Sequence, residues 1–440
     1  MRIYARAPFW VCVIVAAACL QGCAPTGKDS VKNRIVVPHY DIRIDGAAPG
    51  TARVSLTLPP FDPLDPIIPK LVSRGDRSGI TSQIHNVECN GTPLTESGKG
   101  QWNLPSKCRT VHWTVDLQDV APDGANVSEQ QSLHLKTPKD WWLISGPSSL
   151  LRLVPPPPRT DVVIAVRDKP LVLDHLPDVI LPPAFFVVGD APSHRTTTDG
   201  LSLTYVADDL ARVETTVKVE DHIRGIAYFR RILRSDDHTD IPKDLTVVWL
   251  GVARNKGDLG GAGGYDTLLA NYIRSKGPPQ KRDLILPLVI VLHEQFHQLT
   301  RGTLPAWMNE SLATYYALKA VSRIYNDPAD IAAARATFLH PDAKIEIGLL
   351  DVQRQIDKEQ DFSHYSLFYS QGAAFWDQID KALSKATKGA KSLDDVLPAI
   401  TSTSYSGDAV LPPHVEDDLA DVPKDELNAL VDKYLTARKR

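Results

Sequence analysis

Two histidines and a glutamate in the second half of the sequence have the types and the spacing of a metal site. His293 and His297 are four residues apart, and Glu294 directly follows the first. On a helix, the two imidazoles would lie one turn apart on the same face and could bind one ion together. In this HExxH pattern the histidines bind zinc and the glutamate takes a proton from zinc-bound water. The alternative is a surface helix with two histidines and a solvated glutamate, and a third ligand would decide between them.

A carboxylate on a following helix is the best candidate for that third ligand. Thr300 and Thr303 stand where a metzincin would have glycine and histidine, so that class is excluded. Glu310 opens a second helical pattern at 307–316, and the intervening residues 298–309 can turn the chain back antiparallel to the first helix. Two histidines and one carboxylate leave the fourth position of a tetrahedral zinc open, which is typical of catalytic sites.

The segment from Leu286 to Leu299 has the periodicity of the helix that these histidines need. Apolar residues or histidines stand at 286, 289, 290, 293 and 297, which lie on one helical face. Pro287 is compatible with this helix because it would fall in the first turn.

The two helical patterns together resemble those of the gluzincin metallopeptidases, particularly the aminopeptidase N and glycyl aminopeptidase families. The letters that carry the resemblance are HEQFH at 293–297 and WMNESLATYY at 307–316. In those families an HExxH helix is followed by a W-x-N/S-E-G-F-x-x-Y helix that bears the third ligand. Downstream, YSQGAA at 369–374 resembles their Tyr-x-Lys-Gly segment.

This resemblance implies a zinc-dependent metallopeptidase with one Zn²⁺ ion held by His293, His297 and Glu310. Glu294 would accept the proton of the attacking water and pass it to the leaving amine. The Tyr369 hydroxyl would donate a hydrogen bond to the tetrahedral oxyanion, a role in which loss of one donor costs about 10²–10³ in rate. A tyrosine in an aromatic-rich helix can instead serve packing.

The chain departs from the family pattern at several positions. The spacer between the HExxH motif and Glu310 is shorter than in either family, Ser311 replaces a glycine, and Gln371 replaces a lysine. The Gly-x-Met-Glu-Asn segment that binds the free amine of a substrate in aminopeptidase N is missing. Without that segment the residues give no support to trimming of substrate N-termini, and exopeptidase and endopeptidase cleavage both stay open.

A glycine-rich segment stands where the amine-binding segment would be. Gly261, Ala262, Gly263 and Gly264 lack the spacing and the Lys-Ser/Thr ending of a nucleotide-binding loop. We expect these residues to bind substrate, as an edge strand along which a peptide lies.

The distribution of strand and helix patterns predicts an α+β protein. Short alternating runs separated by glycine, proline and asparagine predict a β-sandwich-like N-terminal domain at 34–205. Helical patterns dominate afterwards, and the resemblance implies a thermolysin-like, mainly helical zinc-peptidase domain with C-terminal helices at 206–440.

The N-terminus has the features of an export signal. A basic start precedes an apolar run at 9–20, which is shorter than a membrane-spanning helix. LQGC at 20–23 resembles the lipobox of bacterial lipoproteins, which implies a signal peptide at 1–22, acylation of Cys23 and a linker at 23–33. The expected location is the bacterial cell envelope, lipid-anchored in the outer membrane or periplasm. An uncleaved anchor and a plain secretory signal are the alternatives.

Cysteine usage and net charge complete the sequence-based hypotheses. Cys89 and Cys108 can form a disulfide in an exported protein, or remain two buried thiols. A formal net charge of −4 gives no general affinity for nucleic acid, so the expected partners are a peptide or protein substrate and the membrane that holds the lipid. Two other functions stay open, namely a non-catalytic gluzincin-like scaffold lipoprotein and a zinc hydrolase of a non-peptide bond.

Overall fold

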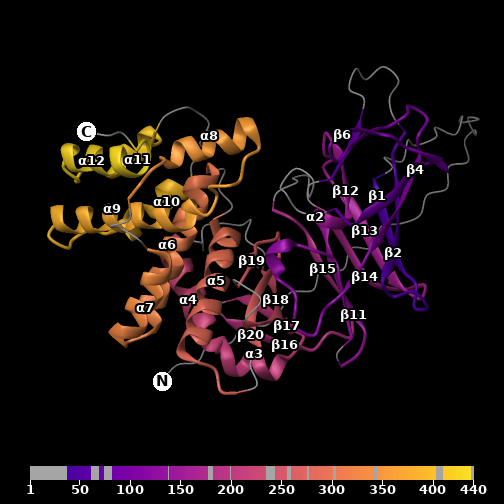
Figure 1. The fold of residues 1–440 in the computed structure, drawn as a ribbon, viewed down its shortest axis with the longest axis horizontal. Helices are drawn as coiled ribbons and strands as arrows, with labels where there is room; N and C mark the ends of the chain where they lie inside the picture. The colour runs from indigo at the N-terminus through magenta and orange to yellow at the C-terminus, as the bar shows by residue number, and fades with distance from the viewer. Residues whose placement is uncertain are drawn as a thin grey trace, which may run out of the picture. The chain divides into compact units, whose positions relative to one another are not determined.

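A computed structural model gives the fold of most of the chain. It describes residues 37–60, 69–73, 82–136, 138–176, 182–198, 200–233, 243–254, 259–274, 277–300, 304–339, 344–402 and 410–437. Strands dominate up to Ala207 and helices dominate after Arg274 (Figure 1), so the predicted α+β class is confirmed. The predicted signal peptide, Cys23 and linker lie outside the described residues.

The first large sheet has seven strands. Their order is β14 (Lys169–Leu176), β13 (Thr160–Val166), β1 (His39–Ile44), β2 (Thr51–Thr57), β8 (Thr110–Asp116), β4 (Ile84–Cys89) and β5 (Thr92–Pro93). In β1, β2 and β8 buried and more exposed residues alternate, because successive side chains of a strand point to opposite faces. The alternating runs seen in the sequence are therefore strands with one face in a core.

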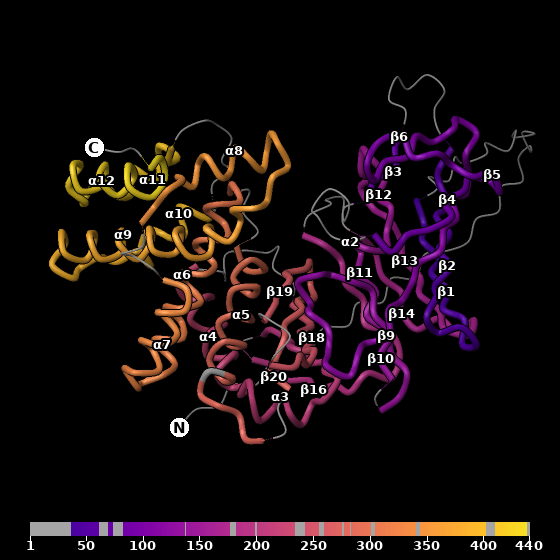
Figure 2. Tube along the Cα trace, viewed as in Figure 1, coloured from indigo at the N-terminus to yellow at the C-terminus, as the bar shows by residue number. Residues whose placement is uncertain are grey.

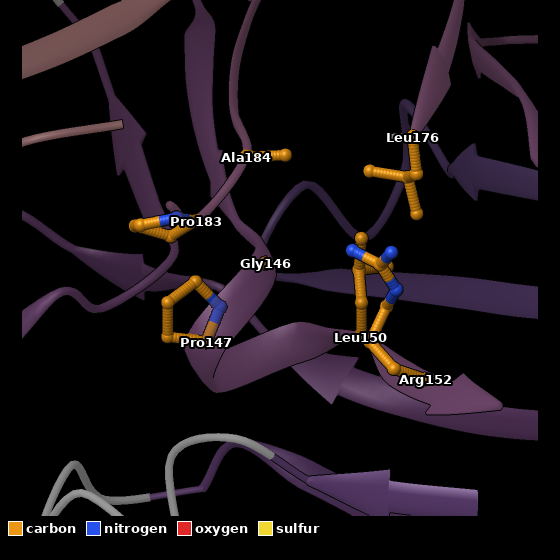
Figure 3. Close-up of a pocket in the computed structure, with 7 residues that line it drawn as sticks. All are labelled: Gly146, Pro147, Leu150, Arg152, Leu176, Pro183 and Ala184. Carbon is orange, nitrogen blue, oxygen red and sulfur yellow. The ribbon is translucent and has the colours of Figure 1, made fainter. Parts of the chain in front are cut away.

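Two four-stranded sheets complete the N-terminal part. One has the order β15 (Phe185–Gly189), β11 (Trp141–Ser145), β10 (Leu133–Leu135), β9 (Gln118–Asp119); the other is β12 (Leu151–Val154), β3 (Lys70–Ser73), β7 (Gln101–Asn103), β6 (Glu96–Gly98). Cys89 at the end of β4 and Cys108 before β8 form a disulfide. A small pocket beside the short helix α2 (Gly146–Ser149) is lined by Gly146, Pro147, Leu150, Arg152, Leu176, Pro183 and Ala184 (Figure 3). None of the residues predicted for the metal site lines it.

A five-stranded sheet lies next to the predicted metal helices. Its order is β16 (Ser193–Thr198), β17 (Leu201–Ala207), β18 (Asp244–Ala253), β20 (Thr267–Arg274) and β19 (Gly261–Ala262). The middle strands β17, β18 and β20 are parallel, and the edge strands β16 and β19 are antiparallel to their neighbours. The domain boundary predicted between 205 and 206 falls inside β17 and stays a prediction.

Both faces of this sheet are buried, which explains the apolar runs at 247–250 in β18 and 268–270 in β20. One face, with Tyr205 and Trp249, packs in a core with the helices. The opposite face, with Val248 and Leu269, packs against side chains of β10, β11 and β15, including Trp141. The sheet thus fixes the position of its edge strand β19 relative to the helices.

The helical part begins after β17. Its elements are α3 (Leu210–Thr216), α4 (Val219–Leu233), α5 (Lys281–Thr300), α6 (Ala306–Ile324), α7 (Pro328–Phe338), α8 (Leu349–Glu359), the π-helical turn η4 (Phe368–Gly372), α9 (Ala373–Ala386), α10 (Leu393–Ser402), α11 (Pro413–Asp418) and α12 (Lys424–Tyr434). Among the described residues, no helix has the length and apolar character needed to span a membrane.

Helix α5 begins five residues earlier than the apolar pattern indicates. Asp283 accepts a hydrogen bond from the Gln280 backbone N–H through its side chain, which favours a helix start at Lys281. Pro287 therefore lies inside the helix, and the prediction that it falls in the first turn is wrong. Glu310 is also not at the very start of its helix, because α6 begins at Ala306.

Candidate metal centre

Helices α5 and α6 bring together the three side chains predicted as metal ligands. The two helices pack against each other, and α5 lies between α6 and β19 (Figure 2). The Nε2 atoms of His293 and His297 are 3.1 Å apart. Oε2 of Glu310 lies 3.1 Å from Nε2 of His293 and 3.3 Å from Nε2 of His297. Three possible ligand atoms from two helices thus surround one point.

These separations fit a tetrahedral zinc ion. Zinc binds imidazole nitrogen at about 2.0–2.1 Å and carboxylate oxygen at about 2.0–2.2 Å, so two ligand atoms in a tetrahedron lie about 3.3 Å apart. The three separations at the site are 3.1, 3.1 and 3.3 Å. One ion could therefore contact all three atoms with little rearrangement of the side chains.

The imidazole rings are oriented by residues of α6 on either side of Glu310. Nδ1 of His297 lies 3.3 Å from the Asn309 side-chain oxygen, which accepts its proton. Nδ1 of His293 lies 3.1 Å from the Thr314 hydroxyl, and that hydroxyl donates its own proton to the Glu310 carbonyl. In their neutral, metal-binding form both rings would therefore carry their single proton on Nδ1 and direct the Nε2 lone pair at the shared point, as metal binding requires.

Tyr365, which no sequence motif indicates, holds the carboxylate of Glu310, the predicted third ligand. The Tyr365 hydroxyl donates to Oε1 of Glu310 at 2.9 Å, while Oε2 faces the imidazoles. Tyr365 lies three residues before the turn η4, and π-helical turns occur frequently at functional sites. Its spacing of four from Tyr369 was a signal in the sequence, but nothing there showed that the ring reaches Glu310.

Tyr369 lies close to the imidazole of His293. Its ring centroid is 5.6 Å from that of His293 and 5.7 Å from that of Tyr365. The Tyr369 hydroxyl donates a hydrogen bond to the Tyr365 hydroxyl oxygen. Burial, followed by the charge of Glu310, raises the pKa of Tyr369 well above its ordinary value, so the hydroxyl stays protonated and can donate.

Glu294 is buried beside the edge strand β19. The Gly263 backbone N–H donates to its carboxylate. A Cβ placed on Gly261 would lie 2.4 Å from Oε1 of Glu294, and one on Gly263 would lie 3.1 Å from Oε2. Glycine is therefore needed at 261 so that the backbone can approach the carboxylate. Gly261 and Gly263 thus lie against Glu294, and the expected role of Gly261, Ala262, Gly263 and Gly264 in substrate binding stays a prediction.

Glu294 could also be considered as the third ligand. His293, Glu294 and His297 offer ligand atoms within 4.8 Å of one another. We favour Glu310, because its Oε2 lies 3.1 and 3.3 Å from the two imidazoles and its other oxygen is held by Tyr365. Glu294 already accepts from the Gly263 N–H, which suits a base that stays beside the ion without binding it.

The carboxylates and the imidazoles at the site stabilise each other's charged forms. Burial alone would raise the pKa of Glu310, but the imidazoles of His297 and His293 hold it well below its usual range. Burial also opposes the charged form of His297, yet the Glu310 and Glu294 carboxylates raise its pKa to about 9. Burial raises the pKa of Glu294, which increases its basicity as a proton acceptor.

Two departures from the family pattern have structural explanations. Ser311 accepts a hydrogen bond from the Trp376 indole at 2.8 Å, and a Cβ on Gly372 would lie 2.5 Å from the Ser311 Cβ. The turn η4 can thus lie close against α6, which places Tyr369 near the imidazoles. Gln371 donates to the backbone carbonyls of Ile347 and Tyr434 and therefore ties η4 to the C-terminal segment.

Comparison with known proteins supports the fold. No protein-family model and no curated protein sequence matches the chain. The crystal structure of an aminopeptidase N family protein from Idiomarina loihiensis is similar, with 15% identity, a TM-score of 0.61 and coverage of 88% of this chain and 76% of that one. Legionella pneumophila aminopeptidase A, solved with aspartic acid, has 15% identity, a TM-score of 0.51 and coverage of 91% and 49%. The chain therefore has a fold similar to that of these aminopeptidases.

Proposed function

We propose that the protein is a zinc-dependent metallopeptidase of the gluzincin type that hydrolyses peptide bonds outside the cytoplasm. The observation that carries this proposal is the convergence of His293, His297 and Glu310 on one point, with ligand-atom separations of 3.1–3.3 Å, beside the buried carboxylate of Glu294. Two imidazoles and one carboxylate leave one zinc position open, which distinguishes a catalytic site from a structural one.

Each side chain has a distinct part in the proposed reaction. A zinc ion bound by the three ligands would supply Lewis acidity to the scissile carbonyl and acidify a water molecule. Glu294 accepts the proton of the attacking water and returns it to the leaving amine. The Gly263 N–H orients the Glu294 carboxylate, because Gly263 directly follows β19 and donates to that carboxylate.

The substrate would bind beside β19, where Tyr369 completes the site. Strand β19 is an edge strand, so a peptide could extend along it, with Gly261 to Gly264 lining its path. The Tyr369 ring packs against the imidazole of His293, and its protonated hydroxyl would donate to the oxyanion that forms on the attacked carbonyl.

The proposed location rests on the N-terminal sequence and the disulfide. The lipobox-like residues at 20–23 favour a lipid anchor on Cys23 in the outer membrane or periplasm. The Cys89–Cys108 disulfide is consistent with an oxidising compartment. The membrane is therefore proposed as a partner through the lipid, and a peptide or protein as the substrate.

A peptide library tests the proposed function. Purified wild type should contain about one zinc per chain and cleave peptides in the library, as read by mass spectrometry. Glu294→Gln should keep the zinc and lose cleavage, whereas the exposed control Glu359→Gln should behave as wild type. Zinc without any cleavage that depends on Glu294 would favour a scaffold or a hydrolase of another bond.

A further inference from the structure

Asn271 on β20 is a fully buried polar residue whose side chain bonds only to backbone. Its oxygen accepts from the N–H groups of Gly260 and Val127, both at 3.1 Å. Its nitrogen donates to the carbonyls of Ala125 at 2.8 Å and Leu250 at 2.9 Å. These four bonds use the full hydrogen-bonding capacity of an amide side chain. One residue thus joins β18, the start of the glycine-rich segment and the chain at 125–127.

The contacts of Asn271 determine where β19 begins. The Asn271 backbone N–H also donates to the Gly260 carbonyl at 3.0 Å, so both polar backbone groups of Gly260 bond to Asn271. The next residues, Gly261 and Ala262, pair with β20. Gly263 then donates to Glu294. Only two residues, Gly261 and Ala262, therefore lie between the residue that contacts Asn271 and the residue that donates to the proposed base.

Residues 126–128 contact Gly260 from another direction. A Cβ on Gly260 would lie 2.2 Å from the Asn126 side-chain oxygen and 2.8 Å from the Ser128 Cβ. The Asn126 oxygen is itself fixed, because it accepts from the Ser128 backbone N–H at 3.0 Å and from the Ser128 hydroxyl at 2.7 Å. Gly260 is thus enclosed between β20 and a segment of the N-terminal part of the chain.

We infer that Asn271 is a positioning residue for Glu294. By fixing Gly260 between β20 and residues 125–128, it fixes Gly263, whose N–H orients the Glu294 carboxylate. The expected effect of Asn271 on kcat rests on the proposed peptidase function, because that effect requires Glu294 to transfer the proton. The structural part of the inference stands without that function, since it concerns only the position of the 260–263 backbone.

Hydrogen exchange and kinetics on the full, zinc-loaded chain test this inference. In Asn271→Ala, the amides of Gly260 and Gly263 should exchange at least about 10-fold faster than in wild type. With the peptide that wild type cleaves fastest, kcat should fall about 10- to 100-fold while KM and zinc content change little. The control Val247→Ala makes a cavity in β18 of the same sheet. It should lower the melting temperature but keep wild-type kcat and wild-type exchange at Gly263.

Three outcomes decide the matter. Unchanged exchange at Gly263 in Asn271→Ala, or an equal change in Val247→Ala, would overturn the inference. If wild type cleaves nothing, the proposed function fails, and the exchange data still decide whether Asn271 positions Gly263. If Asn271→Ala does not fold, hydrogen exchange in the wild type tests the inference instead. The amides of Val127, Gly260 and Gly263 should then exchange with the same free energy of opening, because all three are held through Asn271. Opening of Gly263 alone at a lower free energy would contradict the inference.

Discussion

The Tyr365 hydroxyl donates to Oε1 of Glu310 at 2.9 Å, and the other oxygen of the same carboxylate lies 3.1 Å from Nε2 of His293. The carboxylate is thus held on one side by a neutral donor and presents its other oxygen to the imidazoles. Each ring is likewise oriented through its Nδ1, by Asn309 or Thr314. Side chains that hold metal ligands in this way strengthen metal binding.

Replacing Tyr365 should weaken zinc binding. Loss of an outer partner of a ligand typically costs about 10- to 100-fold in metal affinity. We therefore expect Tyr365→Phe to lower zinc affinity by that factor, as measured by competition with a chromophoric chelator. Tyr325→Phe, which removes a hydroxyl that bonds to Asp221 instead, is the matched control and should bind zinc as wild type does. Equal affinity in Tyr365→Phe and wild type would show that the hydroxyl does not support the ligand.

Replacing Tyr369 should affect the rate and leave the metal in place. The Tyr369 ring lies beside His293, but its hydroxyl bonds to Tyr365 and not to a ligand. Tyr369→Phe should lower kcat about 10²–10³-fold, because the oxyanion loses a donor, and should keep wild-type zinc content. A kcat within a few-fold of wild type would assign Tyr369 to packing.

Much of this site follows from local sequence patterns. The four-residue spacing of His293 and His297 needs only a helix to bring the rings together, and Glu310 needs only a second helix nearby. The predicted start of the first helix was wrong, because it was taken from the apolar periodicity alone. The start of α5 depends on Asp283, which lies outside the periodic residues.

Other parts of the site depend on tertiary contacts that leave little trace in the sequence. Tyr365 stands in no recognised motif, and its role appears only once η4 packs on α6 through Gly372 and Ser311. Asn271 directly follows the apolar run at 268–270, where a polar residue was a signal, but its partners at 125–127 are distant in the sequence.

A methyl group on Gly261 should displace the proposed base. The added Cβ would lie 2.4 Å from Oε1 of Glu294 and 2.8 Å from Ile290 Cγ2, so strand or carboxylate must move. Gly261→Ala should reduce kcat about 10²-fold, as a misplacement near 1 Å can, with zinc retained. The control Gly277→Ala adds a methyl with nothing within 4 Å and should retain wild-type kcat. Full activity in Gly261→Ala would contradict the close approach of β19 to Glu294.

Lowering the pH should destabilise the fold because of His222, a buried histidine outside the candidate metal centre. His222 is buried on α4, 2.9 Å from the Tyr205 hydroxyl, and burial lowers its pKa from 6.5 to about 3. Between these values the unfolded chain binds a proton that the folded chain does not, so stability falls as the pH drops below 6.5. The contribution is about 1.4 kcal/mol per pH unit for one proton.

Denaturant unfolding at several pH values tests this contribution. His222→Gln should reduce the slope of unfolding free energy against pH between pH 6 and pH 4 by about 1.4 kcal/mol per unit. The other acid-sensitive groups are common to both proteins, so the difference reports His222. Parallel slopes in the two proteins would show that His222 does not resist protonation.

Anomalous X-ray diffraction at the zinc absorption edge, from crystals of the zinc-loaded full chain, shows directly which side chains bind the ion. We expect one peak about 2.0–2.2 Å from Nε2 of His293, Nε2 of His297 and Oε2 of Glu310, with Glu294 outside that distance. A peak bound by Glu294 in place of Glu310, or no peak between the two imidazoles, would contradict this assignment.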